Sequence, residues 1–413
     1  MGLDPGRTVA ELRELHELTG DERGAQRVCW TKTWARAREW FRSKLDELPL
    51  EVQTDEAGNL WATLPGRADE TLVLGGHLDS VPNGGWLDGA LDALAALEVV
   101  RRLAQEPPPP LAVRLVDWAD EEGARFGRSL FGSSAAAGTL EPDAVRHLVD
   151  SDGVSLPEAL AGHGVDLDRA TTARGQLAGV AGYLELHIEQ GPVLESLGLP
   201  LGAVVGCFGL ERHVVTFRGQ SAHAGSTPFG ARRDAFAAAA RLALETREIA
   251  RRHDGLATTG SLRLEPGIPT AVAGLCELVV DFRRLDADAL RAMVAETRAA
   301  SERIAGTERV EAAWTQLFAS APVDFDADLV ALAEESIRET AGRSHRVASG
   351  PLHDATEMAR AGIPTAMIFV QSLGGLSHTR EEDTRVEHLE LAVVAFDRLV
   401  EKTLRRLSSG PGP

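Results

Sequence analysis

The chain has 413 residues, of which 44% are apolar and 25% are charged, and its formal net charge at pH 7 is −19. This length exceeds what one hydrophobic core usually supports, so we expect two domains. The negative charge argues against nucleic acid and anionic membrane surfaces as partners, because both would be repelled. An anionic substrate would need arginines placed at its own binding site.

The cysteines and the N-terminus indicate the cellular compartment of the protein. Cys29, Cys207 and Cys276 are far apart in the chain and form no CxxC pair. The N-terminus is charged and lacks the apolar segment of a signal peptide. No apolar run approaches the roughly 20 residues that cross a bilayer. We therefore expect a reduced, cytoplasmic protein.

The first part of the chain predicts a βαβ unit. An apolar strand over residues 71–74, a helix over 89–105 and a second apolar strand over 111–118 follow one another. Strand, helix and strand at this spacing predict parallel strands in one sheet. The other elements expected before residue 210 are helices over 7–19 and 31–46 and strands over 50–52, 60–64, 183–188 and 201–207.

The pattern changes near residue 211. The elements expected there are strands over 213–218, 260–264, 275–283 and 309–314 and helices over 232–253 and 286–304. Their βαββαβ order is the split-βαβ pattern of a small α+β sandwich. The α/β pattern then resumes, with helices over 327–341, 354–361 and 387–406 and a strand over 365–370. We expect a discontinuous α/β catalytic domain, residues 1–211 and 322–413, with an inserted domain over 212–321.

Five possible metal ligands lie beyond apolar strands or on the turns that follow them. Neutral imidazole and carboxylate suit Zn²⁺, Mn²⁺, Co²⁺ or Ni²⁺. Five groups are too many for one tetrahedral structural site, but they suit two ions about 3.5–4 Å apart that share a bridging carboxylate and a bridging water. Asp88 suits the bridge. The five residues are His77, Asp88, Glu122, His187 and His378.

Each of these residues also has a structural alternative. A single histidine after a strand is more often structural than a ligand, and Asp88 could cap the helix that begins near Gly89. The acidic run 120–122 could be a solvated loop, or one carboxylate could bind metal while its neighbour acts as a base. Asp79 could accept the ring N–H of His77. Because all five candidates end strands of one predicted domain, their joint pattern favours metal.

Two residues of the inserted domain are candidates for contact with a substrate. His223 lies on the polar turn SAHAGSTP, where a lid would face a cleft. Arg283 closes the strand ELVVDFR and could pair with an anion, although a surface arginine is the simpler interpretation.

Several segments resemble one known family. They are GGHLDSVPNGGWLDG, DEEGARFG, LELHIEQGPVLE, GQSAHAGSTP followed by RRDA, and GLSHTREED. They resemble the M20-type metallopeptidase superfamily, and within it the hydantoinase/carbamoylase amidase branch. That branch contains N-carbamoyl-L-amino-acid hydrolases, β-ureidopropionase and allantoate amidohydrolases. The resemblance extends from about residue 25 to residue 400, with the segments in the same order.

The resemblance implies a two-metal catalytic domain and a βαββαβ lid that also mediates dimerisation. It implies Glu121 as the general base and Asp79 as the carboxylate that orients His77. It also implies His223 as a lid histidine that helps to stabilise an oxyanion. The metal ligands that it implies are His77, Asp88 as the bridge, Glu122, His187 and His378, and the polar groups near the substrate are Gln190, Arg283 and His353.

The chain departs from the family pattern at two positions. Thr270 lies where relatives commonly carry an Asn, so one amide donor to the substrate would be absent. Asp92 lies where Gly is common, which adds either a charge near the metals or a surface carboxylate.

We therefore expect an enzyme that hydrolyses the carbamoyl or ureido C–N bond of a small carboxylate substrate through a Glu121-activated water. N-carbamoyl-L-amino acids and ureido acids such as allantoate are the expected substrates. An aminoacylase or dipeptidase on the same scaffold is the first alternative. A non-catalytic protein that binds metal or ligand is the second, although no ligand or base is missing.

Overall fold

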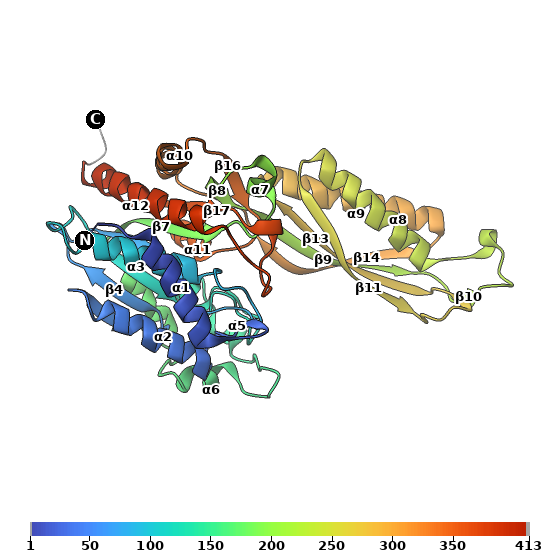
Figure 1. Ribbon diagram of the computed structural model, residues 1–413. Helices are drawn as coiled ribbons and strands as arrows, with labels where there is room; N and C mark the ends of the chain where they lie inside the picture. The colour runs from blue at the N-terminus through green and yellow to red at the C-terminus, as the bar shows by residue number, and fades with distance from the viewer. Residues whose placement is uncertain (1, 410–413) are drawn as a thin grey trace. The chain divides into compact units, whose positions relative to one another are not determined.

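The computed structural model describes residues 2–409, which divide into two compact units (Figure 1). The first unit contains the chain up to Gly206 and from Phe325 onward, and the second is Cys207–Asp324. The predicted insertion, residues 212–321, lies within the second unit. The assignment of this unit as a lid stays a prediction.

The first unit is built on a mixed sheet whose central strands are parallel. Its strands follow the order β8-β17-β7-β5-β6-β4-β3, and β16 pairs with β8. β5 is parallel to β6 and to β7, and β17 is parallel to β7, whereas β4 and β8 run antiparallel to their neighbours. The strands are β3 (Glu51–Thr54), β4 (Leu60–Leu64), β5 (Thr71–His77), β6 (Ala112–Trp118), β7 (Val180–Ile188), β8 (Leu201–Cys207), β16 (Arg346–Ser349) and β17 (Thr365–Val370).

Burial explains why the central strands are apolar runs. Every residue of β5, β6 and β17 is buried, as expected for parallel strands covered on both faces. The expected βαβ unit is present, because the crossover from β5 to the adjacent parallel strand β6 is a single helix, α3 (Ala90–Leu103). All residues of α3 are buried.

Helices α1, α3 and α12 pack against one another in this unit (Figure 1). Ion pairs join them, among them Arg7 with Glu98 at 2.7 Å and Arg102 with Asp397 at 2.7 Å. The helices are α1 (Pro5–Thr19), α2 (Lys32–Leu45), α4 (Phe131–Ala137), α5 (Pro142–Val145), α6 (Leu156–Ala161), α7 (Val193–Leu197), α10 (Ala327–Ala341), α11 (Asp354–Arg360) and α12 (Val386–Ser408). The short elements are β1 (Gly20–Asp21), β2 (Gly24–Ala25), η1 (Ala170–Leu177) and η3 (Leu373–Gly375).

The second unit confirms the βαββαβ prediction. Its four-stranded antiparallel sheet has the order β11-β13-β9-β14. Burial alternates along β13, and its buried side chains belong to the core of this unit. The elements are β9 (Gly209–Arg218), β10 (Ala222–His223), η2 (Phe229–Ala231), α8 (Ala235–Arg252), β11 (Leu256–Glu265), β12 (Ala271–Val272), β13 (Leu275–Arg284), α9 (Ala287–Glu308), β14 (Glu311–Ser320) and β15 (Val323–Asp324).

The strands of the second unit are longer than their apolar patterns predict. Leu210 still pairs with Arg283 on β13 and with Ser320 on β14. Main-chain hydrogen bonds thus continue the strands beyond the segments in which apolar and polar side chains alternate. A sequence pattern predicts only those alternating segments.

Two observations concern the predicted cellular location of the protein. Cys29, Cys207 and Cys276 are all buried. Within residues 2–409, no helix combines the length and the apolarity that a bilayer crossing requires. The cytoplasmic location stays a prediction.

Candidate active site

The candidate ligands of the first unit meet at one edge of its sheet. His77 is the last residue of β5, and it is paired with Trp118, the last residue of β6. Glu122 follows β6 after a short loop, and His187 is the penultimate residue of β7. Because these strands are parallel, their carboxyl ends lie on the same edge, where α/β proteins bind ligands.

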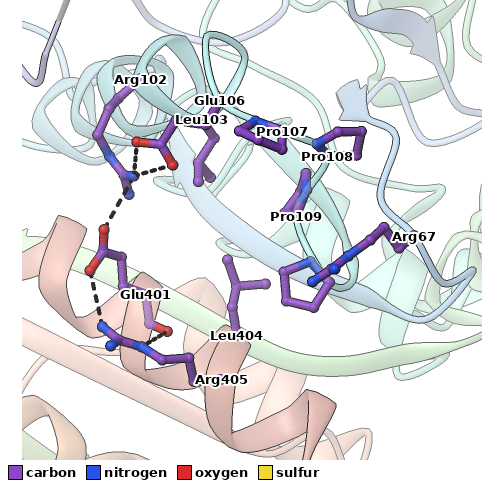
Figure 2. A pocket seen from close by; sticks show the side chains of 11 residues that line it. Arg67, Arg102, Leu103, Glu106, Pro107, Pro108, Pro109, Glu401, Leu404 and Arg405 are labelled. Atoms are coloured by element: carbon purple, nitrogen blue, oxygen red, sulfur yellow. Dashed lines mark hydrogen bonds and ion pairs between the residues drawn. The ribbon is translucent and has the colours of Figure 1, made fainter.

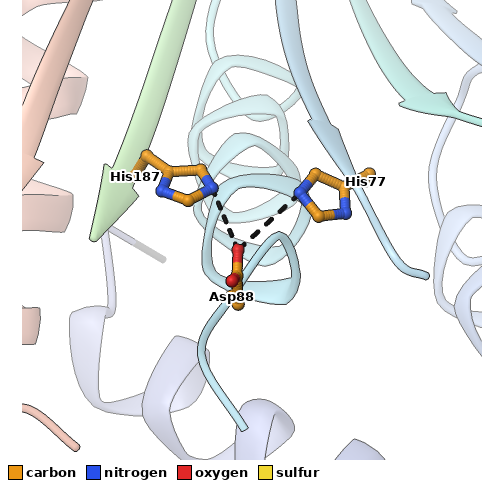
Figure 3. A group of neighbouring side chains, drawn as sticks. All are labelled: His77, Asp88 and His187. Atoms are coloured by element: carbon orange, nitrogen blue, oxygen red, sulfur yellow. Dashed lines mark ion pairs between the residues drawn. The ribbon is translucent and has the colours of Figure 1, made fainter. Parts of the chain in front are cut away.

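The first cluster consists of His77, Asp88 and His187. Their ligand atoms lie within 4.8 Å of one another, and all three residues are buried. Nε2 of His187 lies 3.2 Å and Nε2 of His77 lies 3.9 Å from Oδ1 of Asp88. Figure 3 shows that both rings direct a nitrogen at Asp88, His77 from the end of β5 and His187 from β7.

The other ring nitrogen of each histidine faces a main-chain carbonyl. Nδ1 of His187 lies 2.8 Å from the oxygen of Ile188, and Nδ1 of His77 lies 3.1 Å from the oxygen of Asp79. A carbonyl oxygen can only accept, so each Nδ1 carries the hydrogen. With an ion bound, each Nε2 would then present its lone pair to that ion, as a metal ligand must.

The second cluster consists of Asp88, Glu122 and His378. Nε2 of His378 lies 3.3 Å from Oδ2 of Asp88 and 3.4 Å from Oε2 of Glu122. Asp88 thus directs Oδ1 to the first cluster and Oδ2 to the second. Oε1 of Glu122 is buried and has no hydrogen-bond partner in the described part of the chain, so a ligand position at this carboxylate is open.

Asp88 is not a helix cap. Gly89 is the N-cap residue of α3, and no side chain makes a capping hydrogen bond there. Gly89 has φ +67°, and a Cβ atom at this position would lie 2.3 Å from the ring of His77. A glycine is needed here because both the backbone conformation and the imidazole exclude a side chain.

Negative charge dominates the site. Burial and the charge of Asp88 raise the pKa of Glu122 to about 7. Burial and the charge of Asp79 raise the pKa of Asp120 to about 8. Burial raises the pKa of Glu121 well above the range of an ordinary glutamate; a protonated His77 opposes this rise and the charge of Glu122 adds to it. Carboxylates crowded in this way fit a divalent cation, which would neutralise them.

Glu121 belongs to neither cluster but lies beside the first. Its Oε2 is 3.7 Å from Nε2 of His77, and the residue is 8% exposed. The carboxylate of Asp79 lies 3.6 Å from Nδ1 of His77. It also accepts main-chain hydrogen bonds from Glu121 at 3.3 Å and from Glu122 at 3.2 Å. Asp79 therefore contacts both the histidine and the acidic loop, and its predicted role in orienting His77 remains a prediction.

A surface pocket of the same unit lies at the other edge of the sheet. Its volume is about 400 Å³, and it is formed in part by Pro107–Pro110, which precede β6 (Figure 2). Arg102 in its wall is already paired with Glu106 and Glu401, at 3.1 and 3.2 Å. Because this pocket does not include the clusters, it is not the candidate active site.

Comparison with known proteins decides the family. The profile of the peptidase family M20/M25/M40 matches residues 73–402. The chain belongs to this family. It is 38% identical over 376 residues to an N-carbamoyl-L-amino acid amidohydrolase of Geobacillus stearothermophilus, with 90% of this chain and 91% of the relative covered.

Two further M20/M25/M40 relatives support the assignment. An allantoate amidohydrolase of Escherichia coli K12 is 35% identical over 372 residues, which cover 89% of this chain and 90% of the relative. The crystal structure of a hydantoinase/carbamoylase family amidase from Burkholderia multivorans superimposes with a TM-score of 0.89 at 31% identity. That match covers 97% of this chain and 98% of the amidase.

These findings confirm the resemblance predicted from the motifs. The chain is an M20-family hydrolase with the mixed α/β architecture expected from its sequence. Membership of the family, together with the His, Asp and Glu clusters, supports binding of divalent metal ions.

Gln190 and His353, both predicted near the substrate, lie in the first unit of this M20 chain. Nε2 of Gln190 donates to Oδ2 of Asp88 at 2.8 Å. His353 is 2% exposed, and its ring centroid lies 4.4 Å from that of His187. Burial and the charge of His187 hold the pKa of His353 well below that of an ordinary histidine. Contact of either residue with a substrate stays a prediction.

Asp92, the unusual acid of α3, points into the protein. It is 1% exposed, and neither carboxylate oxygen has a hydrogen-bond partner among residues 2–409. Burial raises the pKa of Asp92 well above that of an ordinary aspartate, although the charge of His187 opposes the rise. The alternative of a surface carboxylate is therefore wrong for Asp92.

His223 and Thr270 lie on paired segments of the second unit. β10 and β12 pair His223 with Ala271, and the carbonyl of Thr270 accepts a hydrogen bond from Ala224 at 2.9 Å. Main-chain N–H groups of Gly225 and Ser226 donate to Nδ1 of His223, at 3.2 and 3.1 Å. Nδ1 is thus an acceptor, and Nε2 of His223 carries the hydrogen.

Arg283, also in the second unit, is not an isolated surface arginine. Its Nε donates to Oδ1 of Asp281 at 2.8 Å. Asp281 also pairs with Arg212 at 2.7 Å, so the acid holds two guanidinium groups. The roles of His223, Thr270 and Arg283 toward a substrate stay predictions.

Sequence reasoning missed three residues near the clusters. Oγ of Ser377 lies 3.0 Å from Oδ2 of Asp88, Glu382 accepts from the main chain of Asp88, and Arg27 is fully buried with its Nε donating to the carbonyl of Leu78. Ser377 and Glu382 lie in the motif GLSHTREED, which was a usable signal. Arg27 lies outside any motif, so the sequence contains no signal that could have identified it.

Proposed function

We propose that this chain hydrolyses the carbamoyl or ureido C–N bond of N-carbamoyl-L-amino acids or of related ureido acids such as allantoate. The observation that carries the proposal is the pair of ligand clusters that share Asp88. The names of the amidohydrolases that are similar to the chain over about nine tenths of its length support the substrate class.

The donor atoms suit two divalent ions, one in each cluster. Imidazole nitrogen and carboxylate oxygen fit Zn²⁺, Mn²⁺, Co²⁺ or Ni²⁺. His77 and His187 would hold one ion, Glu122 and His378 the other, and Asp88 would contact both. When bound, such a pair lowers the pKa of water and polarises a carbonyl or ureido oxygen.

The chain's own residues supply the proton transfers and the orientation of the substrate. Glu121 takes a proton from the attacking water and passes it to the leaving nitrogen, for which a raised pKa is suited. His223, with its hydrogen on Nε2, donates to the oxygen that becomes negative. From an N-carbamoyl amino acid and one water, the products are the amino acid, ammonia and carbon dioxide.

A substrate panel tests this function. Ammonia release is measured with N-carbamoyl amino acids and allantoate, and release of free amine is measured with N-acetyl amino acids and dipeptides. Each assay is run with Mn²⁺, Zn²⁺, Co²⁺ and Ni²⁺ in turn. We expect turnover of the first group. Turnover of only the second group would identify an aminoacylase or dipeptidase, and metal binding without any turnover would identify a binding protein.

Arg283→Ala is expected to raise KM for substrates with a free carboxylate far more than for their neutral amides. The expected increase is about 10–100-fold, the range of hydrogen bonds to a charged group. Arg284→Ala is the matched control, because Arg284 is the next residue of β13 and is also paired with an aspartate, Asp254. Equal effects of Arg283→Ala on carboxylates and amides would remove Arg283 from the carboxylate role.

We also propose a homodimer through the second unit. The outer strands of its sheet carry exposed apolar side chains, among them Leu256 (58%) on β11 and Leu317 (53%) and Phe318 (44%) on β14. Exposed edge strands of this kind favour association with another chain. Light scattering is expected to show a dimer that Phe318→Asp weakens. A monomeric wild type would contradict the proposal.

A further inference from the structure

The acidic run between His378 and α12 contains two neighbouring glutamates in opposite environments. Glu381 is exposed, and it pairs with Arg380 at 2.8 Å. Glu382 is only 1% exposed, and no ion pair within 4.0 Å compensates its charge among the described residues. A buried carboxylate needs other partners, because its desolvation is costly.

The partners of Glu382 come from two loops of the first unit. Oε1 accepts main-chain hydrogen bonds from Leu87 at 3.1 Å and from Asp88 at 3.0 Å. Oε2 accepts from the hydroxyl of Ser377 at 2.8 Å. One carboxylate thus connects the loop that carries Asp88 with the loop that carries His378.

The loop before α3 leaves space for this carboxylate. A Cβ atom at Gly85 would lie 2.1 Å from Oε1 of Glu382, so any larger residue would displace the acid. The next residue, Trp86, donates from its indole nitrogen to Oδ1 of Asp383 at 3.3 Å. The two loops are therefore fitted to each other around Glu382.

The hydroxyl of Ser377 lies between two carboxylates but has only one hydrogen. Its oxygen is 2.8 Å from Oε2 of Glu382 and 3.0 Å from Oδ2 of Asp88. The nearer acceptor is Glu382, so the hydrogen is drawn away from Asp88. Oδ2 of Asp88 then keeps a lone pair for the second cluster.

We propose that Glu382 is a positioning residue that holds Asp88 in place to serve both clusters. It acts by anchoring the main chain of Asp88 and by taking the hydrogen of Ser377. The proposal rests on the proposed pair of metal ions. Partners of this kind behind metal ligands typically change metal affinity by about 10–100-fold.

Glu382→Gln tests the role of the hydroxyl. The amide oxygen can still accept from Leu87 and Asp88, but the amide nitrogen cannot accept from Ser377, whose hydrogen then turns to Asp88. Calorimetric titration of chelator-stripped protein with Mn²⁺ is expected to show affinity about 10–100-fold weaker in at least one cluster. The unfolding temperature in EDTA is expected to stay unchanged. Glu381→Gln, the matched control, is expected to bind as wild type, and wild-type binding by Glu382→Gln overturns the proposal.

Two further variants keep the test decisive. Gly85→Ala displaces Glu382 without removing its charge and is expected to weaken Mn²⁺ binding to a similar degree; unchanged binding contradicts the anchoring role.

In a Ser377→Ala background, Glu382→Gln is expected to have little further effect on Mn²⁺ binding, because the hydroxyl that it redirects is gone. An undiminished effect there overturns the role of the hydroxyl.

The titration also separates this inference from the proposed function. A wild type that binds fewer than two ions per subunit contradicts the two-ion site itself. A wild type that binds two ions while Glu382→Gln and Gly85→Ala bind them equally well contradicts only the role of Glu382.

Discussion

Glu121→Gln is expected to lower kcat by about 10²–10⁴-fold, the usual contribution of a general base, while bound metal stays at the wild-type level. Glu121 belongs to neither ligand cluster, yet its Oε2 lies 3.7 Å from Nε2 of His77. Glutamine fills the same space but cannot take a proton from water. Initial rates on the best substrate of the panel and metal content by atomic absorption check this result.

The adjacent acid provides the control for Glu121. Glu122 lies in the second cluster, so Glu122→Gln is expected to lose metal as well as activity. If Glu121→Gln loses metal to the same extent, Glu121 is a ligand and not a base. Full activity of Glu121→Gln would exclude the base role altogether.

Asp88→Asn is expected to weaken metal binding in both clusters at once. Asp88 is the one residue common to them, and its two oxygens face different partners, His187 and His378. The substitution removes a negative charge that both ions would share. We expect a loss of activity at least as large as that of Glu121→Gln, about 10²–10⁴-fold. Metal content and calorimetric titration with Mn²⁺ measure the effect.

Asp92→Asn is the control for Asp88→Asn. Asp92 is also a buried acid beside the site, but it belongs to neither cluster. Its asparagine variant is expected to keep bound metal. Retention of metal in both clusters by Asp88→Asn would contradict the shared role of Asp88.

The sequence predicted most of the fold because its signals are local. The apolar runs of β5 and β6, with α3 between them, follow from burial on both faces of a parallel sheet. The alternation along β13 follows from a sheet with one buried face. Strand ends were less predictable, because the pairing of Leu210 depends on partners more than 70 residues away.

Part of the site was beyond sequence reasoning for the same reason. Glu381 and Glu382 are identical neighbours, and only the approach of Gly85 and Leu87 makes one of them an interior acceptor. Likewise, no local pattern shows that Asp92 points inward.

The sequence by itself determined the class of the protein, the order of its elements and the residue types available to a metal. These properties depend on periodicity and on motifs within short segments. Only the tertiary structure decided that His77 and His187 form one cluster, that Glu122 and His378 form another, and that Asp88 belongs to both. These side chains come from strands and loops that are far apart in the chain. They share a site only because the strands and loops pack together, and this packing sets the distances between the side chains.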